Sequence, residues 1–293
     1  MSRSHWRTAS GLASILLSIS ILLVIRGKHR HPLPPRVQGS LSRSMNCAYG
    51  SKNLTFATLY SSPTECYTLA LGIFLSTFRA EHSSYRVLVL HDATIDIPDE
   101  LAGLAGNAAE FRSIPRIVDY SVVLRLQAMA TKFQLWTLEC FDAVAYFDAD
   151  HVFVGNPDGI FDACRGAPFC AVPDVSPSSK RARQFNAGAM VIEPSTKFAK
   201  ELLEAYRARY LWMNKKDLRR SGDQIFLNHF IRNWRVMPST YNAQHGKQGI
   251  VMHDKVWKNK SGAFVDSMIS SPFLKDLLLK CQLEQVREVS KMT

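Results

Sequence analysis

The stretch AVAYFDADHVF, residues 143–153, predicts a buried strand that ends on two acids. After the apolar residues 143–147 come Asp148 and Asp150, which a single alanine separates. On an extended chain this spacing sends both side chains to the same side. Two carboxylates that face one way repel each other unless one is protonated or a cation lies between them. The stretch therefore favours a site for a hard divalent cation, which could in turn hold a diphosphate; the alternative is a pair of turn or capping residues.

Segments of strand and helix character alternate around this stretch. Residues 53–60 and 85–90, rich in β-branched and aromatic residues, predict strands, and residues 65–80 have apolar side chains at helical spacing. Further helices are predicted over residues 97–109, 128–140, 197–212 and 223–231, and a further strand over 187–192. This alternation is typical of an α/β domain with a parallel sheet, in which ligands bind at the carboxyl ends of the strands.

The first 45 residues differ from the rest of the chain. Residues 8–25 carry no charge and have basic flanks, and no small-residue cleavage pattern follows them, so a transmembrane signal anchor is favoured over a cleaved signal peptide. Residues 1–7 would be a short tail and residues 26–45, rich in Pro, Ser and Arg, a stem. We expect residues 46–293 to form one domain in the lumen of the Golgi or endoplasmic reticulum, behind a single-pass type II anchor.

The net charge of +11 narrows the choice of partners. Part of it comes from residues 1–43, which contain no acid, and part from basic clusters at 180–183 and 215–220. Such an excess attracts nucleic acid, anionic membranes or phosphorylated substrates. Because the sequence has no zinc-finger spacing and no long arginine-rich helix, we expect no nucleic-acid partner and interpret the later clusters as solvated faces.

Six cysteines are present, without the C-x-x-C spacing of a metal site. Cys164 and Cys170 are close enough in sequence to form a disulfide, which a lumenal location allows. Acceptor triplets for N-glycosylation at Asn53 and Asn259 mildly favour the secretory pathway.

Several blocks, in order, resemble those of the glycogenin-like glycosyltransferases, the retaining family eight with the A-type nucleotide-sugar fold. The blocks are Ala57–Tyr60, Thr131–Trp136 (the family's T-K-x-x-x-W), the two acids, Phe185–Gly188 (F-N-[SA]-G), Gly222–Asn228 (G-D-Q-x-x-L-N) and Tyr241-Asn242. They cover about residues 53–257. The resemblance implies a single A-type glycosyltransferase domain, Rossmann-like, with a mostly parallel sheet.

The resemblance also implies a metal site. Asp148 and Asp150 would hold Mn²⁺, which bridges the diphosphate of a UDP-sugar. The family's third ligand is a histidine in H-x-x-G-x-x-K-P-W, for which His253 is the candidate and His245 the alternative. The glycine and proline of that motif are absent here, so the counterpart of the phosphate lysine is Lys255, two residues after His253, or Lys258, or no residue of this chain.

The remaining site residues follow from the same resemblance. The nucleoside would be held by Thr58, Leu59, Tyr60 and Tyr67. The sugar pocket would be shaped by Asn186 and Gly188. Asp223 and Gln224 would face the sugar and its reacting carbon, and Lys132 would approach the sugar or phosphate. The simpler alternatives are a solvated lysine at 132, a plain turn at 186–188 and a helix N-cap at Asp223. His151 is expected to point away from the metal, because strand neighbours alternate.

These residues predict a retaining glycosyltransferase that moves a hexose from a UDP-sugar to a glycan, glycoprotein or glycolipid acceptor. Departure of the diphosphate leaves negative charge on its oxygens, which a cation and a lysine would stabilise. One alternative is a catalytically degenerate relative that binds nucleotide or glycan without turnover. Another is a metal-dependent phosphohydrolase, for which Asp92 is the best further carboxylate.

Overall fold

The computed structural model describes residues 37–41, 53–123, 126–174, 184–220, 222–244, 247–253, 268–269 and 271–290. All of them belong to one compact unit, Arg36–Thr293. The expected anchor, residues 8–25, lies outside this set. Among the described residues, no helix combines the length and the apolar character that crossing a bilayer requires.

A seven-stranded sheet forms the centre of the fold, in the order β10-β8-β9-β6-β2-β3-β4. Its strands are β2 (Leu54–Tyr60), β3 (Val87–Asp92), β4 (Ala109–Ile114), β6 (Ala143–Phe147), β8 (Phe169–Pro173), β9 (Phe185–Ile192) and β10 (Arg235–Val236). Strands β2, β3, β4 and β6 run parallel, whereas β9 is antiparallel to both β6 and β8. The α/β class and the Rossmann-like parallel half are thus confirmed, within a sheet that is mixed.

The chain reverses its progress across the sheet at β2. From β2 it proceeds to β3 and β4 on one side, and it then returns to β6 on the other side of β2. The carboxyl ends of two strands at such a reversal are where α/β proteins bind ligands. Since β6 ends at Phe147, Asp148 and Asp150 lie at this position.

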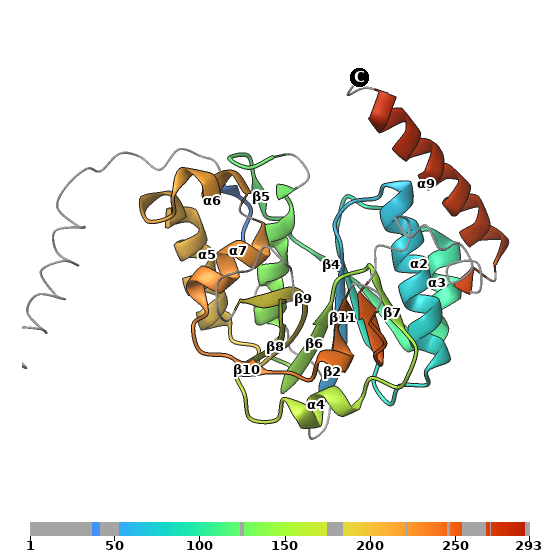
Figure 1. Ribbon diagram of the computed structural model, residues 1–293, viewed down its shortest axis with the longest axis horizontal. Helices are drawn as coiled ribbons and strands as arrows, with labels where there is room; N and C mark the ends of the chain where they lie inside the picture. The colour runs from blue at the N-terminus through green and yellow to red at the C-terminus, as the bar shows by residue number, and fades with distance from the viewer. Residues whose placement is uncertain are drawn as a thin grey trace, which may run out of the picture. The chain divides into compact units, whose positions relative to one another are not determined.

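Helices cover both faces of the sheet (Figure 1). On one side lie α2 (Glu65–Ala80) and α3 (Asp99–Ala105), and on the other the 3₁₀ helix η3 (Met129–Thr137), α5 (Thr196–Ala208) and α7 (Asp223–Phe230). Shorter helices are η1 (Gly106–Ala108), α4 (Gly159–Ala163), η4 (Arg209–Leu211), α6 (Lys215–Arg220) and η5 (Ser239–Tyr241). Helix α2 starts after Thr64, whose side chain accepts a hydrogen bond from the backbone N–H of Tyr67, as an N-cap does.

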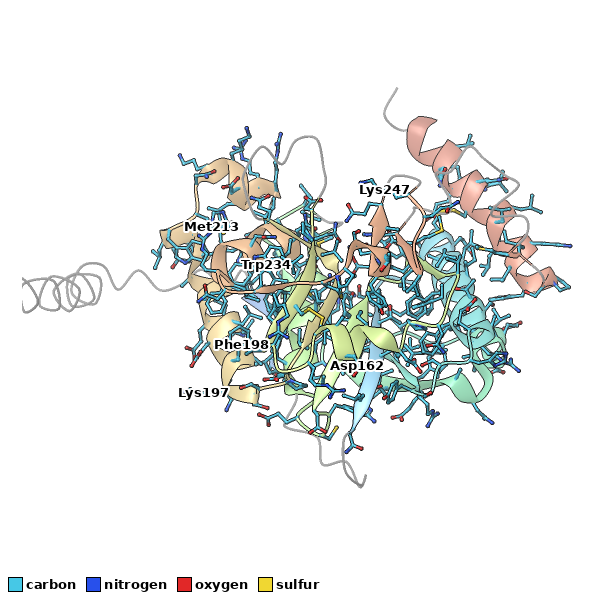
Figure 2. All side chains as sticks on the ribbon, turned by 60° about the horizontal axis from the view of Figure 1, so that its bottom comes forward. Asp162, Lys197, Phe198, Met213, Trp234 and Lys247 are labelled. Carbon is cyan, nitrogen blue, oxygen red and sulfur yellow. A yellow bond between two sulfur atoms is a disulfide. The ribbon has the colours of Figure 1, made fainter. Side chains whose placement is uncertain are left out.

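Aromatic side chains fill both spaces between sheet and helices. On the α2 side, the rings of Phe56 and Phe78 meet edge to face, with centroids 5.1 Å apart. On the α5 side, the partly buried rings of Phe198 and Trp234 pack against the hydrophobic core between the sheet and α5 (Figure 2). Because each side of the sheet is covered, strands such as β6 are apolar along most of their length, which is why residues 143–147 form a continuous apolar run.

A further helix, α9 (Pro272–Ser290), packs against α2. Cys66 in the first turn of α2 forms a disulfide with Cys281 of α9, at a sequence separation of 215. Gly72 permits the close approach of the two helices, because a Cβ at this position would lie 2.5 Å from Cδ2 of Leu274. The expected disulfide between Cys164 and Cys170 is also present.

Two small sheets flank the main one. Strand β7 (His151–Phe153) pairs antiparallel with β12 (Val251–His253), which pairs in parallel with β11 (Ala243–Gln244). This pairing brings His253 opposite His151. Separately, β1 (Val37–Gln38), inside the stretch expected as a stem, pairs with β5 (Val118–Asp119), so ordered structure begins before residue 46.

Some elements differ from the sequence-based predictions. The α-helix predicted over 128–140 is the 3₁₀ helix η3, and the helix predicted over 97–109 ends at Gly106, which adopts a φ of +53°. The chain then enters β4, a strand that was not predicted. Glycine in a left-handed conformation commonly ends a helix, and local apolar spacing alone did not reveal this stop.

Candidate active site

The two acids occupy a turn between strands and not one continuous strand. Strand β6 ends at Phe147 and β7 begins at His151, with the backbone N–H of His151 donating to the carbonyl of Asp148 at 3.2 Å. The premise that the two acids lie on one extended strand is therefore wrong, although, after the effect of burial, the charges of both carboxylates raise the pKa of Tyr67 and of His253. In this turn their carboxylates meet different partners, which are Lys132 for Asp148 and His253 for Asp150.

Lys132 is the charged centre of the site. Its Nζ donates to Oδ1 of Asp148 at 3.0 Å, to the carbonyl of Ala187 at 3.1 Å and to Oδ2 of Asp223. Only 5% of its side chain is exposed, so the alternative of a solvated lysine is wrong. Burial lowers the pKa of Lys132, but Asp148 and Asp223 raise it by more, and the net pKa lies above its usual value. The lysine is thus a buried cation that connects η3 to the turn after β6, to β9 and to α7.

Asp148 has a second donor at the same oxygen. The hydroxyl of Tyr146 donates to Oδ1 of Asp148 at 2.6 Å. Burial first, and then Asp148, raise the pKa of Tyr146 well above its usual value, so this hydroxyl stays protonated. The apolar pattern of residues 143–147 indicates only a buried strand and does not reveal this contact.

Asp150 lies beside His253. Nε2 of His253 is 3.4 Å from Oδ1 of Asp150, and both side chains are largely buried. Burial lowers the pKa of His253, but the contact with Asp150 raises it by more, which leaves it above the usual value. The ligand atoms of Asp150, His151 and His253 all lie within 4.8 Å of one another. Such a set of one carboxylate and imidazole nitrogens suits a divalent metal ion.

Gly188 leaves room at the centre of this cluster. A Cβ on Gly188 would lie 2.6 Å from Cε1 of His253, 2.8 Å from Oδ1 of Asn186 and 3.2 Å from Oδ2 of Asp148. Any side chain at position 188 would therefore fill the space that those three groups share. The oxygen and nitrogen donors and this space together fit a bound cation and the phosphate that it would hold.

His151 lies within the cluster, and the expectation that it points away is wrong, because the turn interrupts the alternation of the strand. The ring is fully buried and stacks on His253, with centroids 4.1 Å apart. Nδ1 faces the carbonyl of Asp148 at 2.9 Å, and Nε2 faces Oδ1 of Asn242 at 3.2 Å. Burial, followed by the charge of His253, lowers the pKa of His151 to about 4, so the ring is neutral at pH 7 and has one proton for these two acceptors.

Helix α7 brings Asp223 and Gln224 to the carboxyl end of the sheet. Asp223 is the first residue of the helix, and the N-cap is Gly222, so the capping alternative for Asp223 is wrong. Gln224 accepts from the backbone N–H of Ala187 at 3.1 Å and donates to Oδ2 of Asp174 at 3.1 Å. One turn later, Asn228 exchanges hydrogen bonds with both backbone groups of Phe185 at 2.8 Å. These amides dock α7 on β9.

The candidate nucleoside residues are split between core and surface. Thr58 and Tyr60 are buried, and the hydroxyl of Tyr60 bonds to Thr68 at 2.6 Å. Leu59 is partly exposed, and Tyr67 is 46% exposed. Burial first, and then the charges of Asp150 and Asp148, raise the pKa of Tyr67. Of the four side chains, those of Tyr67 and Leu59 are accessible to a ligand.

Lys255 and His245 lie outside the described residues, so the structure does not place them. Asp92, the further carboxylate considered for a phosphohydrolase, accepts from the backbone N–H of Thr94 at 2.9 Å and lies 3.7 Å from Arg116. It therefore stabilises the turn after β3 and has local partners of its own.

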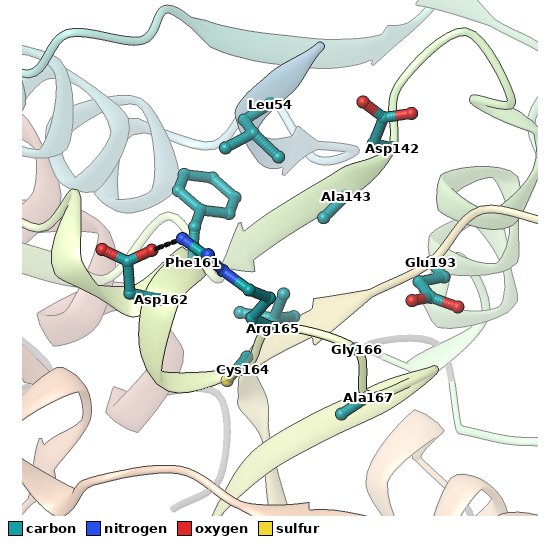
Figure 3. Close-up of a pocket in the computed structure, with 11 residues that line it drawn as sticks. Leu54, Asp142, Ala143, Phe161, Asp162, Cys164, Arg165, Gly166, Ala167 and Glu193 are labelled. Carbon is teal, nitrogen blue, oxygen red and sulfur yellow. Dashed lines mark hydrogen bonds and ion pairs between the residues drawn. The ribbon is translucent and has the colours of Figure 1, made fainter. Parts of the chain in front are cut away.

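A separate hollow of about 260 Å³ lies at the opposite ends of the strands (Figure 3). Leu54 and Ala143, the first residues of β2 and β6, line it together with Glu193 and the exposed ion pair of Asp162 and Arg165. It lies at the amino ends of the parallel strands and is distinct from the cluster around Gly188.

Comparisons with known proteins agree with the resemblance. No family model matches the chain. Over 198 residues, 65% of this chain and 29% of the relative, the sequence is 28% identical to UDP-glucuronate:xylan alpha-glucuronosyltransferase 2 of Arabidopsis thaliana. Over 119 residues, 38% of this chain and 21% of the relative, it is 33% identical to Glycogenin-2 of Homo sapiens. The expected likeness to glycogenin-like glycosyltransferases is confirmed, although the chain spans only about a third or less of the length of its curated relatives.

Solved glycosyltransferases share the fold. GlyE of Streptococcus pneumoniae has a TM-score of 0.56 and 14% identity, covering 81% of this chain and 64% of that chain. The galactosyltransferase LgtC, solved with donor and acceptor sugar analogues, has a TM-score of 0.54 and 16% identity, covering 76% and 95%. At these identities the likeness shows the fold alone, which is the A-type glycosyltransferase fold with its mixed sheet.

Proposed function

We propose that this chain is a retaining glycosyltransferase that transfers a hexose from a UDP-sugar to a glycan, protein or lipid acceptor. Asp148, Asp150 and His253 would hold Mn²⁺. One observation carries the proposal: oxygen and imidazole donors surround the space at Gly188, where the carboxyl end of β6 lies beside the amino-terminal part of β9. The sequence relatives that are named as UDP-glucuronate:xylan alpha-glucuronosyltransferases support it.

Each part of the cluster has a proposed task. When bound, the cation would stabilise the negative charge that develops on the departing diphosphate. Lys132 holds the carboxylates of Asp148 and Asp223 in fixed positions, because all three of its ammonium protons have acceptors there. Asn186 and Gly188 would shape the sugar pocket, and Asp223 and Gln224 would face the sugar. Tyr67 and the end of β2, with Thr58, Leu59 and Tyr60, would border the nucleoside, and Lys255 would approach the phosphates.

Donor hydrolysis by the purified full chain in detergent tests this function. The panel is UDP-glucose, UDP-galactose, UDP-N-acetylglucosamine and UDP-glucuronate; the last is included because relatives are named for it. We expect UDP release that depends on Mn²⁺, stops with chelator and favours one donor. Asp150→Ala is expected to abolish release and to leave the circular dichroism spectrum unchanged. Full turnover by that variant would refute the role given to the acids.

A Golgi or endoplasmic reticulum location, with residues 46–293 in the lumen behind an anchor at 8–25, belongs to the same proposal. The disulfides of Cys66 with Cys281 and of Cys164 with Cys170 support it, because disulfides persist in the oxidising secretory pathway. Protease treatment of intact microsomes should leave the chain protected, and detergent should abolish the protection. Digestion in intact microsomes would exclude a lumenal domain.

A catalytically degenerate relative is the second candidate. The glycine and proline of the family's H-x-x-G-x-x-K-P-W motif are absent after His253, which favours binding without turnover. This candidate predicts Mn²⁺-dependent UDP binding by calorimetry with no hydrolysis of any donor in the panel. Turnover of a single donor would eliminate it.

A further inference from the structure

Asn242 joins the candidate metal ligand His253 to the sugar-pocket residue Asn186. It lies at the end of η5, is 2% exposed, and places its amide between two imidazole rings and a second amide. Its Oδ1 is 3.0 Å from Nδ1 of His253 and 3.2 Å from Nε2 of His151, and its Nδ2 is 3.1 Å from Oδ1 of Asn186. No role follows for this residue from the sequence resemblance, which matches it only as part of a Tyr-Asn pair.

A backbone amide determines which way this chain of hydrogen bonds runs. The N–H of Gly188 donates to Oδ1 of Asn186 at 2.9 Å, so that oxygen must be an acceptor. The group of Asn242 that faces the same oxygen must then be its NH₂. The other end of the Asn242 amide is consequently its oxygen, and this oxygen faces the histidines.

The orientation of Asn242 selects one tautomer of His253. Nδ1 of His253 faces an acceptor oxygen and must carry a proton to bond with it. In a neutral imidazole that is protonated at Nδ1, Nε2 keeps a lone pair. Nε2 is the atom that faces Asp150, at 3.4 Å. A hydrogen bond at the far nitrogen of a metal-bound histidine is a common means of orienting the ring.

We propose that Asn242 is a positioning residue that presents Nε2 of His253, unprotonated, to the cation site. The inference rests on the metal site of the proposed function. His151 supports it as the cross-strand partner of His253, because the stacked rings meet the same oxygen of Asn242. Asn242 thereby links the metal ligand to Asn186 through one buried amide.

The first test measures Mn²⁺ affinity of the full chain by electron paramagnetic resonance of the free ion, without any sugar nucleotide. Asn242→Ala should weaken Mn²⁺ binding about tenfold or more, the usual cost of removing such an outer partner. Asn242→Asp retains an acceptor for Nδ1–H but loses the donor to Asn186, so it should weaken Mn²⁺ binding less than Asn242→Ala does. Asn156→Ala is the matched control, because the amide of Asn156 bonds to the backbone carbonyls of Glu81 and His82 and not to His151 or His253.

Unchanged affinity in a folded Asn242→Ala variant would overturn the proposal. Equal losses in the Ala and Asp variants, together with equal falls in melting temperature, would reduce Asn242 to a packing role. The underlying metal site is checked separately with His253→Ala: if that variant binds Mn²⁺ as tightly as wild type, the proposed site fails regardless of Asn242.

A second test needs no variant of Asn242. Long-range ¹H–¹⁵N spectra of the histidine rings, recorded with Mg²⁺ as a diamagnetic substitute and assigned with His253→Ala, report the tautomer directly. We expect His253 to be protonated at Nδ1. A ring protonated only at Nε2 in the presence of the ion would refute the proposed orientation.

Discussion

At the scale of single residues, Gly188 controls the space in the site. A methyl group there would meet Cε1 of His253 at 2.6 Å and Oδ1 of Asn186 at 2.8 Å, so neighbours must move. We expect Gly188→Ala to cost about 1–3 kcal/mol of stability through overpacking and to weaken Mn²⁺ binding at least tenfold. Chemical unfolding and metal titration measure the two effects.

Gly103→Ala is the matched control, because a Cβ at position 103 meets nothing within 4 Å and alanine is the better helix former. This variant should bind Mn²⁺ normally, and its free energy of unfolding should rise by about 0.5–1 kcal/mol.

Lys132 also carries a prediction at this scale. Lys132→Met would leave Asp148 and Asp223 without their shared cation. Removal of one partner from a buried ion pair costs about 3–5 kcal/mol, and we expect about 2–4 here because the carboxylate of Asp148 is 36% exposed. Denaturant unfolding should show this loss. Lys200→Met, on the exposed face of α5, should stay within about 0.5 kcal/mol of wild type. Equal losses of stability in both variants would contradict the role of Lys132 as the shared counter-ion of Asp148 and Asp223.

The sequence motifs pointed to residues that converge in the structure but did not reveal their contacts. Lys132, Asp148, Gly188 and Asp223 converge as the block order implies, although they come from η3, the turn after β6, β9 and α7. The position of His151 was missed because a turn interrupts strand alternation. The bridging role of Asn242 depends on hydrogen-bond direction, which no local pattern encodes.

At the scale of elements, the disulfides Cys66–Cys281 and Cys164–Cys170 should differ in their effect on stability. A cross-link reduces the entropy of the unfolded chain more when it closes a longer loop, and the pairs span 215 and 6 residues. We expect Cys66→Ala/Cys281→Ala to lose about 3–5 kcal/mol of unfolding free energy and Cys164→Ala/Cys170→Ala about 2. Paired urea titrations under oxidising conditions measure both. The reverse ranking would show that local packing, and not chain entropy, dominates the effect.

Elements with a strong local pattern were predictable, and the others depend on the tertiary fold. Helix α2 has the bounds that its apolar spacing indicated, and β2 differs by one residue from the expected strand. By contrast, β8 and β10 become strands only through their partners in the sheet, and η3 is a 3₁₀ helix although its composition favours an α-helix. Short segments of this kind take their form from long-range contacts.

At the scale of the whole molecule, buried tyrosines predict weakening at high pH. Burial is the main cause that raises the pKa of Tyr60 and Tyr206 above 10.0, with Asp119 adding to the effect at Tyr206. Because the folded state holds these protons more tightly than the unfolded state, stability is complete below pH 10 and falls as pH rises above it. Unfolding free energies between pH 8 and 11 should show the decline. Tyr206→Phe should flatten it, whereas Tyr120→Phe, at a ring that is 56% exposed, should not.

The bond between Cys66 and Cys281 makes most of the protein a closed covalent ring. Every strand of the main sheet except β2 lies inside that ring, since β2 ends at Tyr60. A protease that cuts once anywhere between the two cysteines would open the ring but release nothing. The nicked protein should migrate as one band without reductant and as two bands with it. A break in any single loop between the two cysteines would thus leave both pieces joined, with α2 still fastened to α9.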